Sequence, residues 1–144
     1  MAKKDLYNNL DVDHTIAPQF INSNTTITGS EVDLRGFEGA LVAIHAGTIA
    51  GSSSANIYTP ELQESDSSGT GFTAVADANL LPTTTPEASA ALNGGVDNAL
   101  KKIGYIGTKR YIRLVLTTTA FTTAGGYVSA SVVKGAAHLA SVGA

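Results

Sequence analysis

Apolar and polar residues alternate over short runs in this chain, with the period of two that a β-strand imposes on its side chains. The clearest run covers residues 109–119, where Ile112, Leu114 and Leu116 fall on one side of an extended backbone. A helix would scatter these three residues around its circumference, because its period is 3.6 residues. The run therefore predicts a strand with one face turned to a core.

Further short runs of apolar, β-branched and aromatic residues predict more strands. Residues 127–133 alternate in the same way after two turn glycines, and we expect them to form an antiparallel hairpin with 109–119. Residues 39–46 are almost continuously apolar, which is typical of a central strand covered on both faces. Other strands are expected at 27–34, 56–64, 72–81 and 100–106, with a long loop at 82–95. This set predicts an all-β chain, an antiparallel β-sandwich of jelly-roll type.

The N-terminal residues follow no lasting period, because their apolar side chains are scattered among Asn and Asp. We expect an extended N-terminal arm over residues 1–25, followed by a single β-sandwich domain over 26–144. Ordering each residue of an arm costs about 1–2 kcal/mol. Only burial against another surface offsets that loss, and Tyr7, Leu10 and Ile16 are the candidates for such an interface.

The composition argues against several classes of partner. Charged residues are 15% of the chain and the net charge is −3, whereas an average soluble protein is about 25% charged. Such a chain has no electrostatic basis for binding nucleic acid or an anionic membrane, and its uncharged surface is easily covered by neighbours. The absence of cysteine excludes disulfides and thiolate metal sites. With no long apolar run and no secretory leader, we expect a protein made in the cytosol, without membrane, nucleic acid or cofactor.

Three patterns could carry chemistry, and each has a simpler interpretation. Residues 69–74 match the G-x-G-x-x-A pattern that cradles phosphates, but the parallel strand and helix that should flank it are missing, so we expect a hairpin turn. His14, His45 and His138 share no metal-ligand spacing. Ser, His and Asp all occur, and a catalytic triad is defined by geometry, but no G-x-S-x-G motif is present. We predict no catalytic or metal-binding residue, and the chain is not expected to be an enzyme.

Five of the nine Lys and Arg residues lie in the stretch 101–113, which holds no carboxylate. They are Lys101, Lys102, Lys109, Arg110 and Arg113. Two interpretations remain open: a solvated cationic face on a pair of strands, or a surface that docks onto an acidic partner. Tyr105 and Tyr111 lie among these cations, and Tyr and Arg are favoured at interface hot spots. We take the five cations as candidate interface residues.

Four segments, in this order over most of the chain, resemble a family of small tailed-phage head proteins. They are Asp5-Leu6-Tyr7-Asn8-Asn9-Leu10, Val32-Asp33-Leu34-Arg35-Gly36-Phe37, Leu62-Gln63-Glu64-Ser65-Asp66 and Ile103-Gly104-Tyr105-Ile106-Gly107-Thr108-Lys109-Arg110-Tyr111-Ile112-Arg113. The last segment is the most specific. The family is that of capsid decoration, or cement, proteins, which are encoded beside the major capsid protein.

The resemblance implies a jelly-roll sandwich on the outer surface of an icosahedral bacteriophage capsid. It also implies a small homo-oligomer, a dimer or a trimer, whose partners are the major capsid protein and further copies of the chain. Such a structural virion protein is made in the host bacterial cytoplasm and clamps adjacent capsid subunits. Binding only the expanded shell stabilises that shell by mass action, and many copies multiply a weak contact.

Two other functions remain open. The chain could be a structural protein of the tail or of the head-to-tail connector. It could instead be a carbohydrate-binding jelly-roll module, for which Tyr7, Tyr58, Tyr105 and Tyr127 are the available aromatic side chains, in a chain without Trp.

Overall fold

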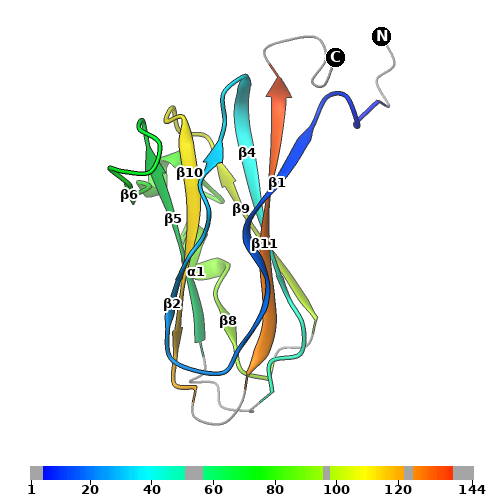
Figure 1. Ribbon diagram of the computed structural model, residues 1–144, viewed down its shortest axis with the longest axis vertical. Coiled ribbons are helices and arrows are strands. Elements are labelled where there is room, and N and C mark those ends of the chain that lie inside the picture. Colours follow the sequence, from blue (N-terminus) through cyan, green and yellow to red (C-terminus); the bar gives the residue numbers. More distant parts are fainter. Residues whose placement is uncertain (1–4, 51–56, 96–97, 122–124, 138–144) are drawn as a thin grey trace.

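Two antiparallel β-sheets pack face to face in the computed structural model, which describes residues 5–50, 57–95, 98–121 and 125–137 (Figure 1). The five-stranded sheet has the order β1 (Asp11–Ile21), β11 (Gly126–Ala137), β4 (Phe37–Ala46), β9 (Ala99–Tyr105) and β7 (Leu80–Leu81). The six-stranded sheet has the order β2 (Thr26–Thr28), β10 (Tyr111–Thr119), β5 (Ile57–Ser65) and β6 (Thr73–Ala74), while β3 (Val32–Asp33) also pairs with β10 and β8 (Leu92–Asn93) with β5.

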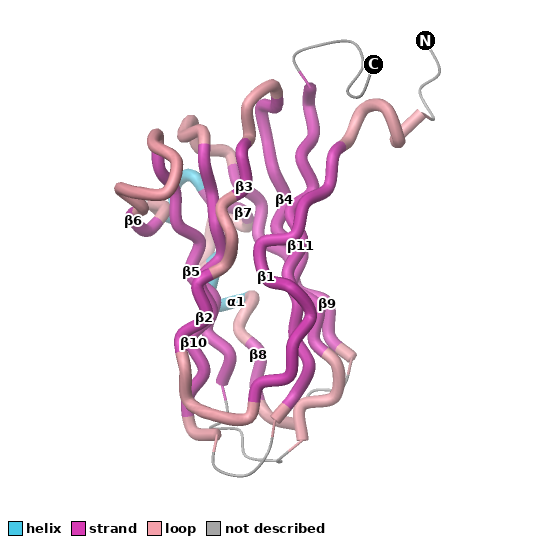
Figure 2. Tube along the Cα trace, viewed as in Figure 1, coloured by secondary structure: helices cyan, strands magenta, loops and turns pink. Residues whose placement is uncertain are grey.

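Strands make up nearly all of the regular structure in the described residues (Figure 2). The exceptions are the single-turn helix α1 (Pro86–Ser89) and the 3-10 turn η1 (Asp77–Asn79). The long loop expected at 82–95 therefore contains α1 and the short strand β8. The prediction of an all-β antiparallel sandwich is confirmed.

The core lies between the two sheets and is filled by alternate residues of each strand. Ile112, Leu114 and Leu116 of β10 are at most 1% exposed, and Val128 and Ala130 of β11 are at most 2% exposed. Burying an aliphatic side chain of this size stabilises the fold by about 1.5–3 kcal/mol. The core faces of both runs were predicted correctly, because the period of two assigns every second residue to the same side.

The hairpin expected between β10 and β11 is wrong. β10 lies in the six-stranded sheet beside β5, whereas β11 lies in the five-stranded sheet between β1 and β4. The chain thus passes from one sheet to the other between these two strands. Alternation shows that each strand buries one face, but it does not show which sheet the strand joins.

Strand β4 is central, as expected, because it pairs with β11 on one side and β9 on the other. It is not covered on both faces, however. Val42 and Ile44 are buried, whereas Leu41 is 37% exposed and His45 is also exposed. The apolar run therefore supplies the core on one side and an uncovered apolar surface on the other.

Most of the segment expected as an arm lies inside the sandwich. Residues Asp11–Ile21 form the edge strand β1 and pair antiparallel with β11. Ile16 and Ile21 are 2% and 4% exposed, so this chain's own core provides their burial. Pairing also satisfies backbone groups that an isolated arm would leave to water. Residues 5–10 form a turn beyond the sheet, near the upper end of β11 (Figure 1).

The crossing from β1 to the six-stranded sheet depends on a close approach at Gly29. A Cβ atom there would lie 2.3 Å from the Thr15 hydroxyl oxygen and 2.6 Å from the Leu114 carbonyl oxygen. The Thr15 hydroxyl donates to the Ser30 carbonyl (2.8 Å) and accepts the Leu114 N–H (3.1 Å). This buried threonine therefore ties β1 to β10 across the sandwich, and only glycine leaves room for it.

The alternation predicts unequal effects for two substitutions on paired strands of the six-stranded sheet. Leu114→Ala removes a fully buried side chain of β10 and should lower the free energy of unfolding by about 2–5 kcal/mol. Thr59→Ala, at an exposed position of β5, should change it by about 0.5 kcal/mol or less. Urea unfolding of both variants measures the difference, and equal effects would contradict the assigned core face.

Candidate functional site

The stretch 101–113 does not form one cationic face, because its residues are divided between the two sheets. Lys101 and Lys102 lie on β9 of the five-stranded sheet, where Lys101 is half-buried on the core side and Lys102 is exposed on the other. Arg113 lies on β10 of the six-stranded sheet, and Lys109 and Arg110 precede that strand. The topology thus separates the first two cations from the last three.

Those last three cations already have partners. The Lys109 ammonium is paired with the Asp66 carboxylate, and Arg110 makes a bidentate pair with Asp33, at 3.0 Å from Nε and 2.7 Å from a terminal nitrogen. The hydrogen bond with Asp66 raises the pKa of Lys109, and that with Arg110 lowers the pKa of Asp33. Local carboxylates therefore balance these charges, which leaves less attraction for an acidic partner.

Arg113 contacts the side-chain amide of Gln63 and the ring of Phe72. Its Nε donates to the Gln63 side-chain oxygen at 2.9 Å. Its guanidinium lies 4.1 Å from the centroid of the Phe72 ring, within the range of a cation–π contact. Arg113 thus joins β10, β5 and the loop before β6, on the six-stranded sheet.

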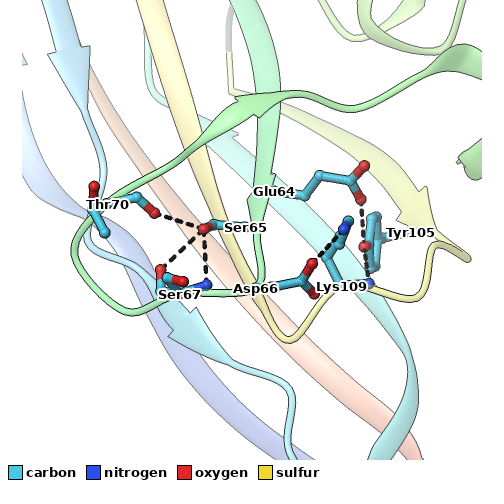
Figure 3. A network of polar contacts seen from close by, with 7 residues as sticks. All are labelled: Glu64, Ser65, Asp66, Ser67, Thr70, Tyr105 and Lys109. Atoms are coloured by element: carbon cyan, nitrogen blue, oxygen red, sulfur yellow. Dashed lines mark hydrogen bonds and ion pairs between the residues drawn. The ribbon is translucent and has the colours of Figure 1, made fainter.

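A polar network links the two sheets at the end where these cations lie (Figure 3). The Tyr105 hydroxyl of β9 donates to Glu64 Oε2 of β5 at 2.6 Å and accepts the Lys109 N–H at 3.0 Å. Burial, followed by the hydrogen bond to Glu64, raises the pKa of Tyr105. The phenol therefore stays neutral and donates to a carboxylate, which is among the stronger hydrogen bonds in proteins.

The adjoining turn is organised by Ser65, which is 4% exposed. Its hydroxyl donates to the Thr70 carbonyl (2.6 Å) and accepts the Ser67 N–H (3.0 Å), as Figure 3 shows. The Gly69 N–H donates to a carboxylate oxygen of Glu31 at 2.7 Å. Strands β5 and β6 pair antiparallel on either side, so the glycine pattern at 69–74 is a hairpin turn, as predicted. The contacts of this turn are made within the protein, and the Gly69 N–H already donates to the Glu31 carboxylate.

An open groove of about 360 Å³ lies beside this network, between the turn from β3 to β4 and the loop from β9 to β10. Arg35, Lys109 and Arg110 line it together with Glu38 and the backbone of Gly36 and Gly107. Because two of its three cations are already in ion pairs, the groove carries little unbalanced charge.

Exposed apolar side chains also gather elsewhere, on the side of the five-stranded sheet that faces away from the core. We call it the outer face; it is centred on alternate residues 127–135 of β11 and 39–45 of β4. The register places one row of residues straight across all five strands. That row reads Val12, Val133, Leu41, Gly104 and Leu81, from β1 to β7.

The outer face is mixed in polarity but carries few charged side chains: His14, His45, Ser129 and Ser131 lie on it beside the exposed apolar residues. Val12 is 59% exposed, Leu81 41% and Leu41 37%. At one end Phe20 and Tyr127 form an exposed aromatic pair with ring centroids 5.1 Å apart. Lys102 is the single Lys, Arg, Asp or Glu that the strand register places on this face within the described residues. Depletion of charge together with exposed aromatic residues is the composition of an interface core.

The candidate residues of the N-terminal segment have three different environments. Tyr7 is 91% exposed and Leu6 65% exposed, on a turn in which the N–H groups of Asn9 and Leu10 donate to the Leu6 carbonyl. Leu10 is half-buried near Gly135, at the edge of the outer face. Ile16 packs in the core and is not available at the surface.

Sequence reasoning missed the outer face for two reasons. Leu41 lies in an apolar run that predicts burial on both sides, and Phe20 lies in a segment without period. The face joins strands from distant parts of the chain, so no local motif marks it. The available signal was the low content of charged residues. It indicates that another protein could cover part of the surface, but it does not show where that part lies.

Within the described residues, no group of three or more His, Asp or Glu side chains could hold a metal ion. His14 and His45 are both exposed, and His138 lies outside those residues. No helix in the same ranges is long and apolar enough to cross a membrane.

No protein-family model and no curated protein sequence matches the chain. Its fold is similar to that of VP2 in the crystal structure of an infectious bursal disease virus subviral particle, at 13% identity and a TM-score of 0.46. That match covers 94% of this chain and 38% of VP2, so the chain spans well under half the length of VP2. The fold is also similar to a xylan-binding domain from CBM 22, at 11% identity and a TM-score of 0.38, covering 94% of this chain and 92% of that domain. Both likenesses are too distant to indicate a function.

Substitutions at two tyrosines test how much the cross-sheet network contributes to the free energy of unfolding. Tyr105→Phe removes the donor to the Glu64 carboxylate and should lower the free energy of unfolding by about 1.5–3 kcal/mol. Tyr111→Phe is the matched control, because Tyr111 is half-buried and its ring packs against Arg110, a contact that phenylalanine keeps. Chemical denaturation compares the two variants, and equal losses would show that the network adds nothing.

The edge strand β1 is tied to β11 by an ion-pair cluster around Lys134. The Lys134 ammonium is 2.6 Å from an Asp11 carboxylate oxygen and 2.7 Å from one of Asp13, and the lysine side chain is 7% exposed. Burial disfavours its charge, but the hydrogen bonds to the two carboxylates outweigh this effect and raise the pKa of Lys134. The same hydrogen bond lowers the pKa of Asp11.

This cluster predicts a loss of stability in acid. Because the pKa of Asp11 is lower in the folded chain, its contribution is fully present above its unfolded pKa of about 3.9 and is lost as pH falls through the folded value. Asp11→Asn should therefore unfold more easily than wild type at pH 7, and the two should converge as the pH falls through the lowered pKa of Asp11 in the folded chain. Urea midpoints measured from pH 7 to pH 2 test this, and a difference that does not depend on pH would contradict it.

Proposed function

We propose that this chain is a structural virion protein that binds the outside of a phage head and stabilises contacts between major capsid protein subunits, as a decoration or cement protein. It acts without a cofactor, a nucleic acid or a membrane, and it is not an enzyme. It is made in the host bacterial cytoplasm and ends on the outer surface of the capsid. The motif resemblance over most of the chain supports this role.

The observation that carries the proposal is the N-terminal turn. Leu6 and Tyr7 project into solvent on a turn of defined hydrogen bonding, beyond the end of the sandwich. The Asp5 carboxylate accepts the backbone and side-chain N–H groups of Asn8, so the turn is organised before any partner arrives. An exposed Leu–Tyr pair on an organised projection suits a pocket on another protein, because little further ordering is needed on binding.

Clamping by such a turn needs no strong single contact. Each copy adds a small apolar burial at the junction of two capsid subunits, and the many copies on one head act together. Binding to the expanded shell alone favours that state in proportion to the free protein concentration. The paired charges at Lys109 and Arg110 take little part in this mechanism, whereas Tyr7 takes the central part.

The carbohydrate-binding alternative loses two of its four aromatic residues. Tyr58 and Tyr105 are 0% and 2% exposed and belong to the core, whereas Tyr7 and Tyr127 are exposed. Aromatic side chains can stack on a sugar only where their faces are open, so two of the tyrosines expected to form the platform cannot contribute. Among the described residues, no specific contact favours the connector alternative.

The decisive experiment is co-sedimentation with DNA-free, expanded heads assembled from the cognate major capsid protein. Wild type should sediment with the heads. The double variant Leu6→Ser/Tyr7→Ser should bind at least tenfold more weakly, because both apolar contacts of the turn are lost. Ile106→Ser is the matched control, since Ile106 is 52% exposed but lies in the loop between β9 and β10.

Three outcomes would count against the proposal. Wild type that stays in the supernatant excludes decoration. Binding to isolated connector or tail complexes in place of heads supports the connector. Equal binding by wild type and the double variant removes the N-terminal turn from the interface.

A further inference from the structure

Strand β9 has one edge that is paired along only part of its length. β4 pairs with the other edge over the whole strand, whereas β7 pairs with this one only at Gly104 and Tyr105. Pro82, which has no N–H, follows β7, and the chain then leaves the sheet for α1. In Figure 2, β7 lies toward the upper end of the sandwich, while the lower part of β9 forms the margin of the sheet. Residues 99–103 are therefore an open edge, about 14 Å long.

The hydrogen bonding beside β7 shows which backbone groups face this open edge. The Ile106 N–H donates to the Asn79 carbonyl at 2.9 Å, so Ile106 directs its N–H toward the side of β7. In an antiparallel ladder a residue's N–H and C=O point to the same side, and successive residues alternate. Gly104, Lys102 and Leu100 thus point away from β4. Gly104 faces Leu81 of β7, but among the described residues no strand faces the other two.

The side chains of the open edge carry positive charge on both faces of the sheet. Lys101 lies on the core side and Lys102 on the outer side. Neither ammonium takes part in an ion pair within the part of the chain that the structure describes. Leu100 is 63% exposed and shares the outer side with Lys102. An added strand would set alternate side chains on the two faces, so an acidic strand would meet a lysine on each.

We propose that this edge binds an extended, acidic segment of another protein as an additional β-strand. The backbone groups of Leu100 and Lys102 supply two donors and two acceptors, which fix the register of the added strand. The two lysines select its charge, and Leu100 offers it an apolar contact. This is recognition by strand addition, in which main-chain hydrogen bonds give affinity and side chains give specificity.

The charge of the edge also excludes other strands. Two copies of this edge would bring lysine against lysine, so the arrangement favours an acidic partner over a second copy of the chain. The opposite margin of the sheet is less suitable, because β1 carries Asp11, Asp13 and Pro18 and its register with β11 shifts twice. The open edge of β9 needs no capsid for its chemistry, so the proposal goes beyond the proposed function.

A titration of the full chain with a short peptide tests the proposal. The probe is a seven-residue peptide of alternating valine and glutamate, with both ends blocked, and the readout is the amide NMR spectrum. Saturable shift changes should centre on Leu100 and Lys102, and hydrogen exchange of these two amides should slow at least tenfold at saturation. The same peptide N-methylated at its three central residues should bind at least tenfold more weakly, because it cannot donate to the edge. A peptide of alternating valine and lysine should not bind.

Variants of the chain separate the backbone contribution from the charge. Leu100→Pro removes an N–H that points to the open side and leaves the ladder with β4 in place, as proline does on edge strands; it should weaken binding at least tenfold. Lys101→Gln/Lys102→Gln should weaken it by about the same factor. Arg35→Gln is the matched control, because Arg35 is exposed and lies away from the edge, in the turn before β4. Circular dichroism and urea unfolding establish that each variant is folded.

Three results would overturn the proposal: no saturable shift change with the valine–glutamate peptide, equal binding of its N-methylated form, or equal binding of the valine–lysine peptide. Unchanged binding by the folded double lysine variant would do the same. None of these measurements uses phage heads, so their failure leaves the decoration role standing, and a failure to sediment with heads leaves the strand-addition site standing.

Discussion

The whole architecture depends on one constraint: each strand of a two-layer sandwich can bury only one of its two faces. Leu114 and Val42 fill the space between the sheets, and every strand that contributes to this core also presents its alternate residues to the outside. In most sandwiches those outward positions are polar. Here the outward residues of β4 and β11 include Leu41, Val133 and Tyr127, so the same period that builds the core also builds an uncovered apolar surface.

Charge is distributed in a way that complements this surface. The cations at Lys109 and Arg110 are paired with Asp66 and Asp33, and Lys134 is enclosed by two aspartates on β1. The exposed ion pairs of Lys109 and Arg110 contribute little to stability, typically below about 1 kcal/mol each, whereas Lys134 is buried. Their effect is on specificity of local geometry: they hold the loop from β9 to β10 and the edge strand in place. A chain that neutralises its charges locally and leaves an apolar face open is suited to assembly.

The N-terminal turn and the outer face are different parts of the molecule. The N-terminal turn presents Leu6 and Tyr7 beyond the sandwich, where a larger scaffold can reach them. The outer face has an exposed aromatic pair at one end and a hollow beside Gly39 and Gly135 at the other. Leu10 lies between the two surfaces, beside Gly135.

Local pattern was sufficient to predict the fold class, the core face of the runs around Leu114 and Ala130, and the turn at 69–74, because a period of two and the turn residues act between near neighbours. Sheet membership was not predictable, since alternation says that β10 and β11 each bury a face but not that they belong to opposite sheets. The environment of Ile16 and the division of the cations between two sheets were equally hidden. The outer face exists only in three dimensions: Val12, Leu41 and Leu81 become neighbours because long-range pairing aligns β1, β4 and β7 in register across one sheet.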